Sequence, residues 1–157
     1  MAGGWESCNA SLVTDVDSNC VFCRVVAGEL PADLVWEDAD TVAFLDSRPL
    51  FKGHTLVTPR QHVETLPDLS AVEPLFEPVR RISRAVEGAL GAAGSFVAIN
   101  NRISQSVPHL HVHVVPRNRK DGLRGFFWPR TTYDGPDDSR EYAQRLRSWL
   151  ATGEGQA

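Results

Sequence analysis

Apolar and polar residues follow strand-like patterns in four short segments of the chain, each bounded by turn-forming residues. These segments are residues 34–36, 41–45, 54–58 and 95–100. The acidic stretch 37–40 predicts a turn between the first two segments, which therefore pair as antiparallel strands. Gly53 permits an unusual backbone angle just before the third segment, and Pro59 ends it.

A longer segment between the third and fourth strands has helical periodicity. Its apolar residues recur three or four positions apart. They are Val72, Leu75, Phe76, Val79, Ile82, Ala85, Val86 and Leu90. Ser70 and Glu73 have the spacing of a capping box, which predicts the helix start, and the stretch 91–94 ends the helix. Pro74 is tolerated in a first turn, but we expect Pro78 to kink the helix or to split off its first turn.

Two further helical segments are expected near the ends of the chain. Residues 24–27 predict a short helical turn that Gly28 ends, and residues 137–150 predict a closing helix with an apolar stripe. The stripe consists of Tyr142, Leu146, Trp149 and Leu150. Strands followed by one long helix and then by strands, without regular β–α–β alternation, predict an α+β domain on a mainly antiparallel sheet.

The most distinctive pattern is the run Pro-His-Leu-His-Val-His-Val-Val-Pro at residues 108–116, which holds three of the five histidines. Successive side chains of a strand point to opposite faces. We therefore expect His109, His111 and His113 on one face of a strand, with apolar side chains on the other. Such a row of imidazoles can hold a metal, bind a phosphate or transfer protons. A metal-binding tract without catalysis is the simpler alternative.

The composition is that of an ordinary globular protein. The chain has 157 residues, of which 42% are hydrophobic and 23% are charged, enough for one domain with a sizeable core. A formal net charge of −4 gives no argument for long-range attraction to nucleic acid or to an anionic membrane. No apolar run approaches the ~20 residues that span a bilayer.

The first eighteen residues lack the basic start and the continuous apolar stretch of a secretory signal. We expect residues 1–18 to form a poorly ordered tail. Three cysteines do not make a disulfide framework, so we expect a reducing, cytoplasmic setting.

Cys20 and Cys23 form a Cys-x-x-Cys motif. Such a motif is either a redox pair or half of a zinc site, and two buried free cysteines are the plain alternative. The thioredoxin-like pattern that a redox pair requires is missing. Zinc needs two further ligands, for which histidines are available, but the spacing does not fix which of them bind.

Other polar candidates flank the expected strands. His54 and His62 lie at the two ends of the third strand, so they can lie close to the histidine run in an antiparallel sheet. Asp46 ends the second strand, where it can accept hydrogen bonds from a sugar diol or form a turn. The loop before the histidine run contains Asn100, Asn101, Gln105 and Ser106. These residues can offer polar groups to an anion, although they are also ordinary loop residues.

With these residues assembled, the chain resembles the histidine triad family of nucleotide hydrolases and transferases, in its zinc-containing Cys-x-x-Cys type. Residues 109–115 satisfy the family pattern His-φ-His-φ-His-φ-φ, where φ is apolar, at every position. Other segments similar to the family are 20–23, 27–31, 43–46, 52–57, 59–62 and 105–108. The resemblance covers about residues 19–117, which we expect to be the domain core. Residues 118–157 would be a C-terminal extension that packs on or beside it.

The resemblance implies a five-stranded antiparallel sheet with one long helix packed on it, assembled as a homodimer. The activity implied is hydrolysis or nucleotidyl transfer at the α-phosphate of purine nucleoside phosphoramidates or dinucleoside polyphosphates, through a covalent nucleotidyl-histidine. No metal is required for this chemistry, and no membrane or nucleic-acid partner is expected. The alternative is a zinc-stabilised module that binds nucleotides or a partner with little turnover.

The resemblance also implies a role for each candidate residue. His111 would attack the phosphorus, His54 or a backbone carbonyl near it would orient His111, and His113 would bind the phosphate or the bridging atom. The substrate would be bound by Phe44 at the base, Asp46 at the ribose, and Asn101, Gln105, Ser106 and Val107 around the phosphate. A structural zinc would be held by Cys20, Cys23, His62 and His109.

Two features of the sequence refine this resemblance. His113 argues against the galactose-1-phosphate uridylyltransferase-like branch, which has glutamine at the third histidine. The loop 101–106 lacks the glycines that are common there in the family, so its phosphate contacts are expected to differ in detail.

Overall fold

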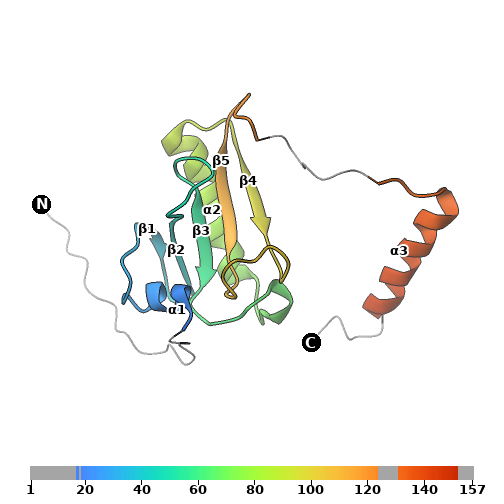
Figure 1. Ribbon diagram of the computed structural model, residues 1–157, viewed down its shortest axis with the longest axis horizontal. Coiled ribbons are helices and arrows are strands. Elements are labelled where there is room, and N and C mark those ends of the chain that lie inside the picture. Colours follow the sequence, from blue (N-terminus) through green and yellow to red (C-terminus); the bar gives the residue numbers. More distant parts are fainter. Residues whose placement is uncertain (1–16, 18, 124–130, 152–157) are drawn as a thin grey trace, which may run out of the picture. The chain divides into compact units, whose positions relative to one another are not determined.

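The computed structural model describes residue 17, residues 19–123 and residues 131–151 (Figure 1). The chain divides into two units, one ending at Asp121 and the other beginning at Gly122. The tail expected over residues 1–18 lies outside the described residues, apart from Asp17. Among the described residues, no helix is long and apolar enough to cross a membrane.

The first unit contains a five-stranded sheet with the strand order β1-β2-β3-β5-β4. Its strands are β1 (Leu34–Glu37), β2 (Thr41–Leu45), β3 (Thr55–Pro59), β4 (Gly94–Ile99) and β5 (Val112–Arg117). Every neighbouring pair is antiparallel. The α+β class and the five-stranded antiparallel architecture expected from the sequence are therefore confirmed.

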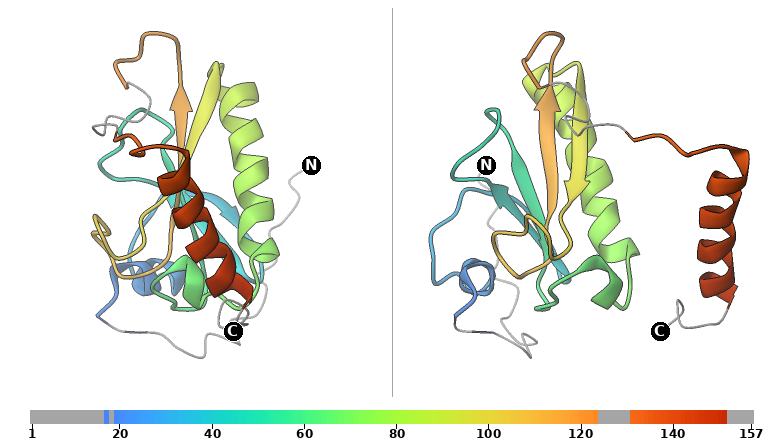
Figure 2. Two further views of the ribbon diagram at one scale, coloured as in Figure 1. Left: turned by 90° about the vertical axis from the view of Figure 1, so that its right-hand side faces the viewer. Right: turned by 45° about the vertical axis from the view of Figure 1, so that its right-hand side comes forward.

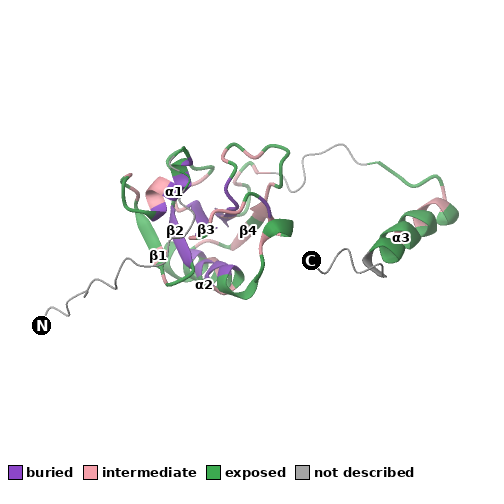
Figure 3. Cartoon of the chain, turned by 90° about the horizontal axis from the view of Figure 1, so that it is seen from below, coloured by how far each residue is buried: buried purple, intermediate pink, exposed green. Residues whose placement is uncertain are grey.

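Different helices cover the two faces of this sheet (Figures 2 and 3). Helix α2 (Glu73–Leu90) packs its apolar stripe on one face. That core contains Leu75, Val79, Ile82 and Val86 of α2 with Ala43, Val57, Val112 and Val114 of the strands. The short helix α1 (Val21–Val26) packs on the other face. Its core contains Phe22, Cys23 and Val26 with Val42, Phe44 and Leu56.

The histidine run differs from its expected structure. Strand β5 begins only at Val112, so the prediction of a strand over all of residues 108–116 is wrong. His113 lies in β5, whereas His109 and His111 lie in the segment that enters it. The alternation of faces is nevertheless present, because Leu110 belongs to the core under α2 and the histidine rings contact one another on the other face.

Both helix starts of the first unit also differ from expectation. Helix α1 begins at Val21 rather than at residue 24, and Cys20 is its N-cap, whose sulfur accepts the N–H of Cys23 at 3.5 Å. Helix α2 begins at Glu73, and its N-cap residue Val72 makes no side-chain capping bond. The capping box predicted at Ser70 is therefore wrong.

Helix α2 continues through Pro78 without interruption, so this proline does not split off the first turn. Pro78 has no N–H to donate to the carbonyl of Pro74, four residues earlier. That carbonyl instead accepts a hydrogen bond of 2.9 Å from Thr41 Oγ1. Thr41 is the first residue of β2 and is only 1% exposed. A strand hydroxyl therefore replaces the missing helical hydrogen bond.

The second unit contains helix α3 (Pro136–Ala151), which matches the closing helix expected over residues 137–150. Within this unit the apolar side chains of Tyr142, Leu146 and Trp149 are more than half exposed. Tyr142 packs against Tyr133, with 5.8 Å between the ring centroids.

The Thr41–Pro74 bond leads to a stability prediction. Thr41→Val keeps the shape of the side chain but leaves the Pro74 carbonyl without its partner, so the free energy of unfolding should fall by about 1–2 kcal/mol. In a Pro78→Ala background the new N–H of residue 78 can bond to this carbonyl, and Thr41→Val should then cost clearly less. Urea unfolding of the four proteins in this double-mutant cycle measures the coupling. Equal costs in the two backgrounds would contradict this account of Pro78.

Candidate active site and metal centre

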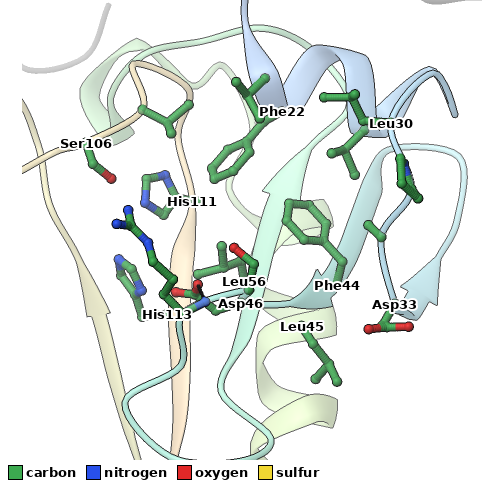
Figure 4. Close-up of a pocket in the computed structure, with 17 residues that line it drawn as sticks. Phe22, Leu30, Asp33, Phe44, Leu45, Asp46, Leu56, Ser106, His111 and His113 are labelled. Carbon is green, nitrogen blue, oxygen red and sulfur yellow. Dashed lines mark hydrogen bonds between the residues drawn. The ribbon is translucent and has the colours of Figure 1, made fainter.

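An open pocket of about 940 Å³ lies on the α1 face of the sheet (Figure 4). Its polar end contains Ser106, Val107, His111 and His113. Its apolar end contains Phe22, Val25, Leu30 and Phe44. Asp46 lies between the two ends, as Figure 4 shows. The pocket therefore offers polar side chains, then a carboxylate, then an apolar wall, in an order that suits an elongated amphipathic ligand.

The tautomer of His111 follows from its hydrogen bond. Its Nδ1 lies 2.7 Å from the backbone oxygen of His109. A carbonyl oxygen can only accept, so Nδ1 carries the proton and donates it. In the neutral ring Nε2 is then unprotonated and holds a free electron pair. A neutral imidazole with a fixed tautomer is suited to act as a nucleophile or a base.

The segment that carries His111 is fixed although it is not a strand. Leu110 donates its N–H to the Val63 carbonyl at 2.7 Å, and its own carbonyl accepts from Thr58 Oγ1 at 2.7 Å. The partners in these two bonds lie near the end of β3 (Thr58) and shortly after it (Val63). The ring of Phe22 packs edge-on against His111, with 5.1 Å between the centroids. These contacts hold the backbone and the ring of His111 in one position.

His54 contacts His113 rather than His111. The N–H of Leu50 donates to His54 Nδ1 at 3.2 Å, which leaves the proton of the neutral His54 ring on Nε2. His54 Nε2 lies 3.0 Å from His113 Nδ1 and therefore donates to it. His113 then carries its own proton on Nε2. His111 and His113 thus have opposite tautomers, one with a free electron pair on Nε2 and the other with an N–H donor there.

Burial favours the neutral forms of His54 and His113. Burial, with the neighbouring His111 and His54 as smaller causes, lowers the pKa of His113 to about 4. The pKa of His54 is also lowered by burial, and the nearby Asp46 carboxylate opposes that shift. Asp46 Oδ2 lies 3.6 Å from His54 Nδ1. The lowered pKa values of His54 and His113 favour the neutral tautomers deduced for these two rings.

Two residues expected near the phosphate do not line the pocket. The side-chain oxygen of Asn101 accepts the N–H of Leu66 at 2.8 Å, and the side-chain amide of Gln105 donates to the Glu64 carbonyl at 2.6 Å. These side chains fasten the loop to the segment after β3, while Ser106 and Val107 lie in the pocket wall. The same loop holds Arg102 and Ser104 at positive φ (67° and 61°), a conformation that glycine adopts more easily.

Phe22 is a pocket residue that the sequence reasoning missed. It contacts His111 as described above, and its ring also lies 5.4 Å from that of Phe44 at an interplanar angle of 73°. Phe22 lies between the two cysteines of the Cys-x-x-Cys motif, which was interpreted only as a metal site. The aromatic side chain at this position was the available indication of a pocket wall.

A second cluster lies where α1 meets the start of the histidine segment. It contains Cys20, Cys23, His62 and His109, with one ligand atom of each within 4.8 Å of the others. The Cys23 sulfur lies 3.1 Å from His62 Nδ1 and 3.5 Å from His109 Nδ1, and the Cys20 sulfur lies 3.5 Å from His109 Nδ1. Tetrahedral zinc with ordinary bond lengths separates sulfur and nitrogen ligands by about 3.5 Å. The four residues therefore fit a zinc ion.

The chemistry of the donors agrees with this fit. His109 Nε2 donates to the Pro59 carbonyl at 2.9 Å, so Nδ1 is unprotonated and faces the sulfurs. A metal-binding histidine usually donates its other ring N–H to an acceptor of this kind. Burial lowers the pKa of His109 to about 4 and raises the pKa of the Cys23 thiol to about 11. A buried thiolate here needs a cation beside it, which a divalent metal supplies.

Comparison with known proteins agrees with the geometry. The family model "HIT domain" matches residues 27–120. The "Protein hit" of Bacillus subtilis (strain 168) is 34% identical over 139 residues, which are 85% of this chain and 96% of the relative. A crystal structure of a HIT family member from the same species superposes with a TM-score of 0.77 and 33% identity, covering 83% of this chain and 96% of that one.

Relatives with named activities or metals are also similar. The "Adenylylsulfatase HINT3" of Arabidopsis thaliana is 34% identical and covers 69% of this chain and 57% of the relative. The "Adenosine 5'-monophosphoramidase hnt1" of Schizosaccharomyces pombe is 34% identical over 71% of this chain and 84% of the relative. A "ZN-bound histidine triad family protein" structure from Mycobacterium smegmatis has a TM-score of 0.64 and 35% identity, covering 85% and 97%.

This chain therefore belongs to the HIT domain family, which confirms the family expected from its histidine pattern.

The lowered pKa values predict acid sensitivity. The unfolded chain protonates a histidine near its ordinary pKa of 6.5, whereas folded His113 does so only near 4. The stabilisation from this neutral ring is therefore complete above about pH 6.5 and is lost as the pH falls toward 4. The free energy of unfolding should fall from about pH 7 to about pH 5, and should fall less steeply in His113→Gln. Identical pH profiles for the two proteins would contradict the burial argument.

The metal cluster predicts about one zinc ion per chain, measured by elemental analysis of untagged protein. Cys20→Ser should lose most of this zinc and lower the melting temperature by about 5–10 °C, because the bond network between α1 and the histidine segment is lost. Cys8→Ser removes a cysteine outside the cluster and should retain zinc and melting temperature. Cys20→Ser should lower the stability of the fold more than it lowers the rate of a reaction at His111. Zinc-free wild-type protein that has never met a chelator would overturn the four-ligand assignment.

Proposed function

We propose that this protein is a hydrolase or nucleotidyl transferase that acts on the α-phosphate of purine nucleoside phosphates, with His111 as the nucleophile. One observation carries the proposal: the hydrogen bond from His111 Nδ1 to the His109 carbonyl leaves Nε2 unprotonated beside the pocket. Relatives named adenylylsulfatase and adenosine 5'-monophosphoramidase support a nucleotide substrate.

The pocket order supports one orientation of the substrate. The phosphate would lie at the polar end with His111, His113 and Ser106, and the base would lie against Phe44 and Phe22. The ribose would then lie near Asp46. Because Asp46 Oδ1 already accepts the N–H of Arg48 at 2.8 Å, Oδ2 is the oxygen better placed to accept bonds from ribose hydroxyls.

The proposed reaction has two steps. In the first, His111 Nε2 forms a bond to the α-phosphorus while the bond from phosphorus to the leaving group breaks, and the leaving group takes the electron pair. The N–H at His113 Nε2 can donate a hydrogen bond to that group, and solvent supplies the proton that a leaving amine takes up. In the second step, water attacks the phosphorus, the bond to Nε2 breaks, and the nucleoside monophosphate leaves. The attacking water loses its proton to solvent, and His111 Nε2 recovers its electron pair.

Positioning supplies most of the catalytic effect in such a reaction, because phosphoryl transfer depends mainly on alignment and charge stabilisation. His54 contributes through His113, whose tautomer it fixes. Asn101 and Gln105 would act only through the loop that presents Ser106. Zinc, when bound to the cysteine–histidine cluster, supplies structural cross-linking of α1 to the histidine segment and takes no part in the reaction.

The proposal includes assembly as a homodimer and a cytoplasmic setting. The first is supported by resemblance to the family and the second by the cysteine content. Light scattering coupled to size-exclusion chromatography measures the oligomeric state.

The nucleophile is tested by substitution. His111→Asn should lower turnover of adenosine 5′-phosphoramidate and diadenosine tetraphosphate by about a thousandfold or more, because the electron pair at Nε2 that would form the covalent intermediate is lost. AMP binding, measured by calorimetry, should change much less. Rapid acid-free quenching followed by mass spectrometry should detect a nucleotidyl adduct on wild-type protein and none on the variant.

Two outcomes would overturn the catalytic assignment. Turnover that persists in His111→Asn would remove His111 as the nucleophile. Nucleotide binding by the wild type without cleavage of either substrate would favour the alternative function, a zinc-stabilised nucleotide-binding module.

A further inference from the structure

Arg48 is a charged pocket residue to which the proposed reaction has so far given no role. It lies in the loop between β2 and β3 and lines the same pocket as His111, His113 and Ser106. The other charged residues in the described pocket wall are Asp33 and Asp46. Asp33 lies at the far, apolar end in Figure 4. In a chain of net charge −4, an arginine in the wall of an otherwise acidic pocket is not explained by a generally basic surface.

The loop that carries Arg48 is held in place. Its two ends are joined by the bond from the Asp46 N–H to the His54 carbonyl at 2.9 Å. The N–H of Arg48 donates to Asp46 Oδ1 at 2.8 Å, and the N–H of Leu50 donates to His54 Nδ1. Pro49 further restricts the backbone of Arg48, the residue before it. The loop that fixes His54 therefore also fixes the point from which the Arg48 side chain extends.

The guanidinium group of Arg48 is available to a ligand. Arg60 and Arg117 form ion pairs with Glu37 and Asp121 at 2.7 and 2.6 Å. Over the described ranges of the chain, no carboxylate lies within ion-pair distance of the guanidinium of Arg48. Its side chain is exposed. A guanidinium in a pocket wall with no carboxylate at ion-pair distance is suited to bind an oxyanion in two-pronged fashion.

We propose that Arg48 binds an anionic leaving group, the phosphate that follows the α-phosphate of the substrate. This inference rests on the proposed function and narrows its substrate class to nucleoside polyphosphates, including dinucleoside polyphosphates. A leaving polyphosphate gains negative charge as its bond to the α-phosphorus breaks, and a guanidinium stabilises that charge. A leaving amine takes up a proton from solvent and carries away no negative charge, so Arg48 does little for phosphoramidates.

The first test compares two substrates. Arg48→Gln should lower kcat/KM for diadenosine tetraphosphate by about tenfold or more and should change kcat/KM for adenosine 5′-phosphoramidate by less than about threefold. Arg48→Lys should recover part of the loss, because an ammonium keeps the charge but not the two-pronged geometry. Arg84→Gln is the matched control. It makes the same charge change at an exposed residue of α2, on the opposite side of the sheet, and should affect neither substrate.

Two kinetic outcomes would overturn the inference. An equal loss with both substrates would mean that Arg48 acts on the α-phosphate or on the fold. No loss with either substrate would mean that it does not touch the leaving group.

A binding experiment separates this inference from the proposed function. Calorimetry should show that wild-type protein binds ADP more tightly than AMP, that added salt reduces this difference, and that Arg48→Gln abolishes it while AMP affinity stays unchanged. These measurements need no turnover. If wild-type protein cleaves neither substrate, the proposed function fails, but the ADP–AMP difference still decides the role of Arg48. The same difference in wild type and Arg48→Gln would reject that role.

Discussion

The hydrogen bonds that fix the protons on the imidazole rings are the constraint on which the rest of the site depends. A neutral imidazole that donates one N–H to a carbonyl must offer an electron pair at its other nitrogen. The Pro59 carbonyl accepts the N–H of the His109 ring, and the His109 carbonyl accepts the N–H of the His111 ring. His113 Nδ1 instead accepts a hydrogen bond from His54 Nε2, which places the proton of His113 on Nε2. Three histidines at equal spacing thereby present different groups: His109 an electron pair toward the cysteines, His111 an electron pair toward the pocket, and His113 an N–H.

The sheet makes this possible by holding a segment that is itself outside the sheet. The backbone groups of Leu110 bond to the end of β3 and to Val63 after it, and its side chain is fully buried in the core under α2. His109 and His111 on either side are therefore held in place, while the His109 carbonyl remains available to accept a hydrogen bond from the ring of His111. A continuous strand would have used the His109 carbonyl in the ladder or left it facing away from the ring of His111.

The fold and the grouping of the site were predictable because they depend on local pattern. The alternation of apolar residues and histidines predicted that Val112 and Val114 face the other side of the strand from His113. The helical spacing from Leu75 to Val86 predicted the face that α2 buries. What escaped prediction depends on partners distant in sequence. Thr41 donates a hydrogen bond to the α2 carbonyl that Pro78 leaves without a helical partner. Gln105 and Asn101, which were expected near the phosphate, instead form hydrogen bonds with the backbone of Glu64 and Leu66. The change from strand to bend before Val112 is likewise set by Thr58 and Val63 rather than by the histidine run.

His109 serves the two centres through different parts of the residue. Its imidazole faces the cysteines, and its backbone oxygen orients His111. A backbone oxygen is present whatever amino acid occupies the position. Mutations can therefore remove the four-residue cluster one side chain at a time while the acceptor that orients His111 is retained. If the proposed metal and reaction are both present, selection can act on them separately, and a metal-free form can arise through intermediates that keep the orientation of His111.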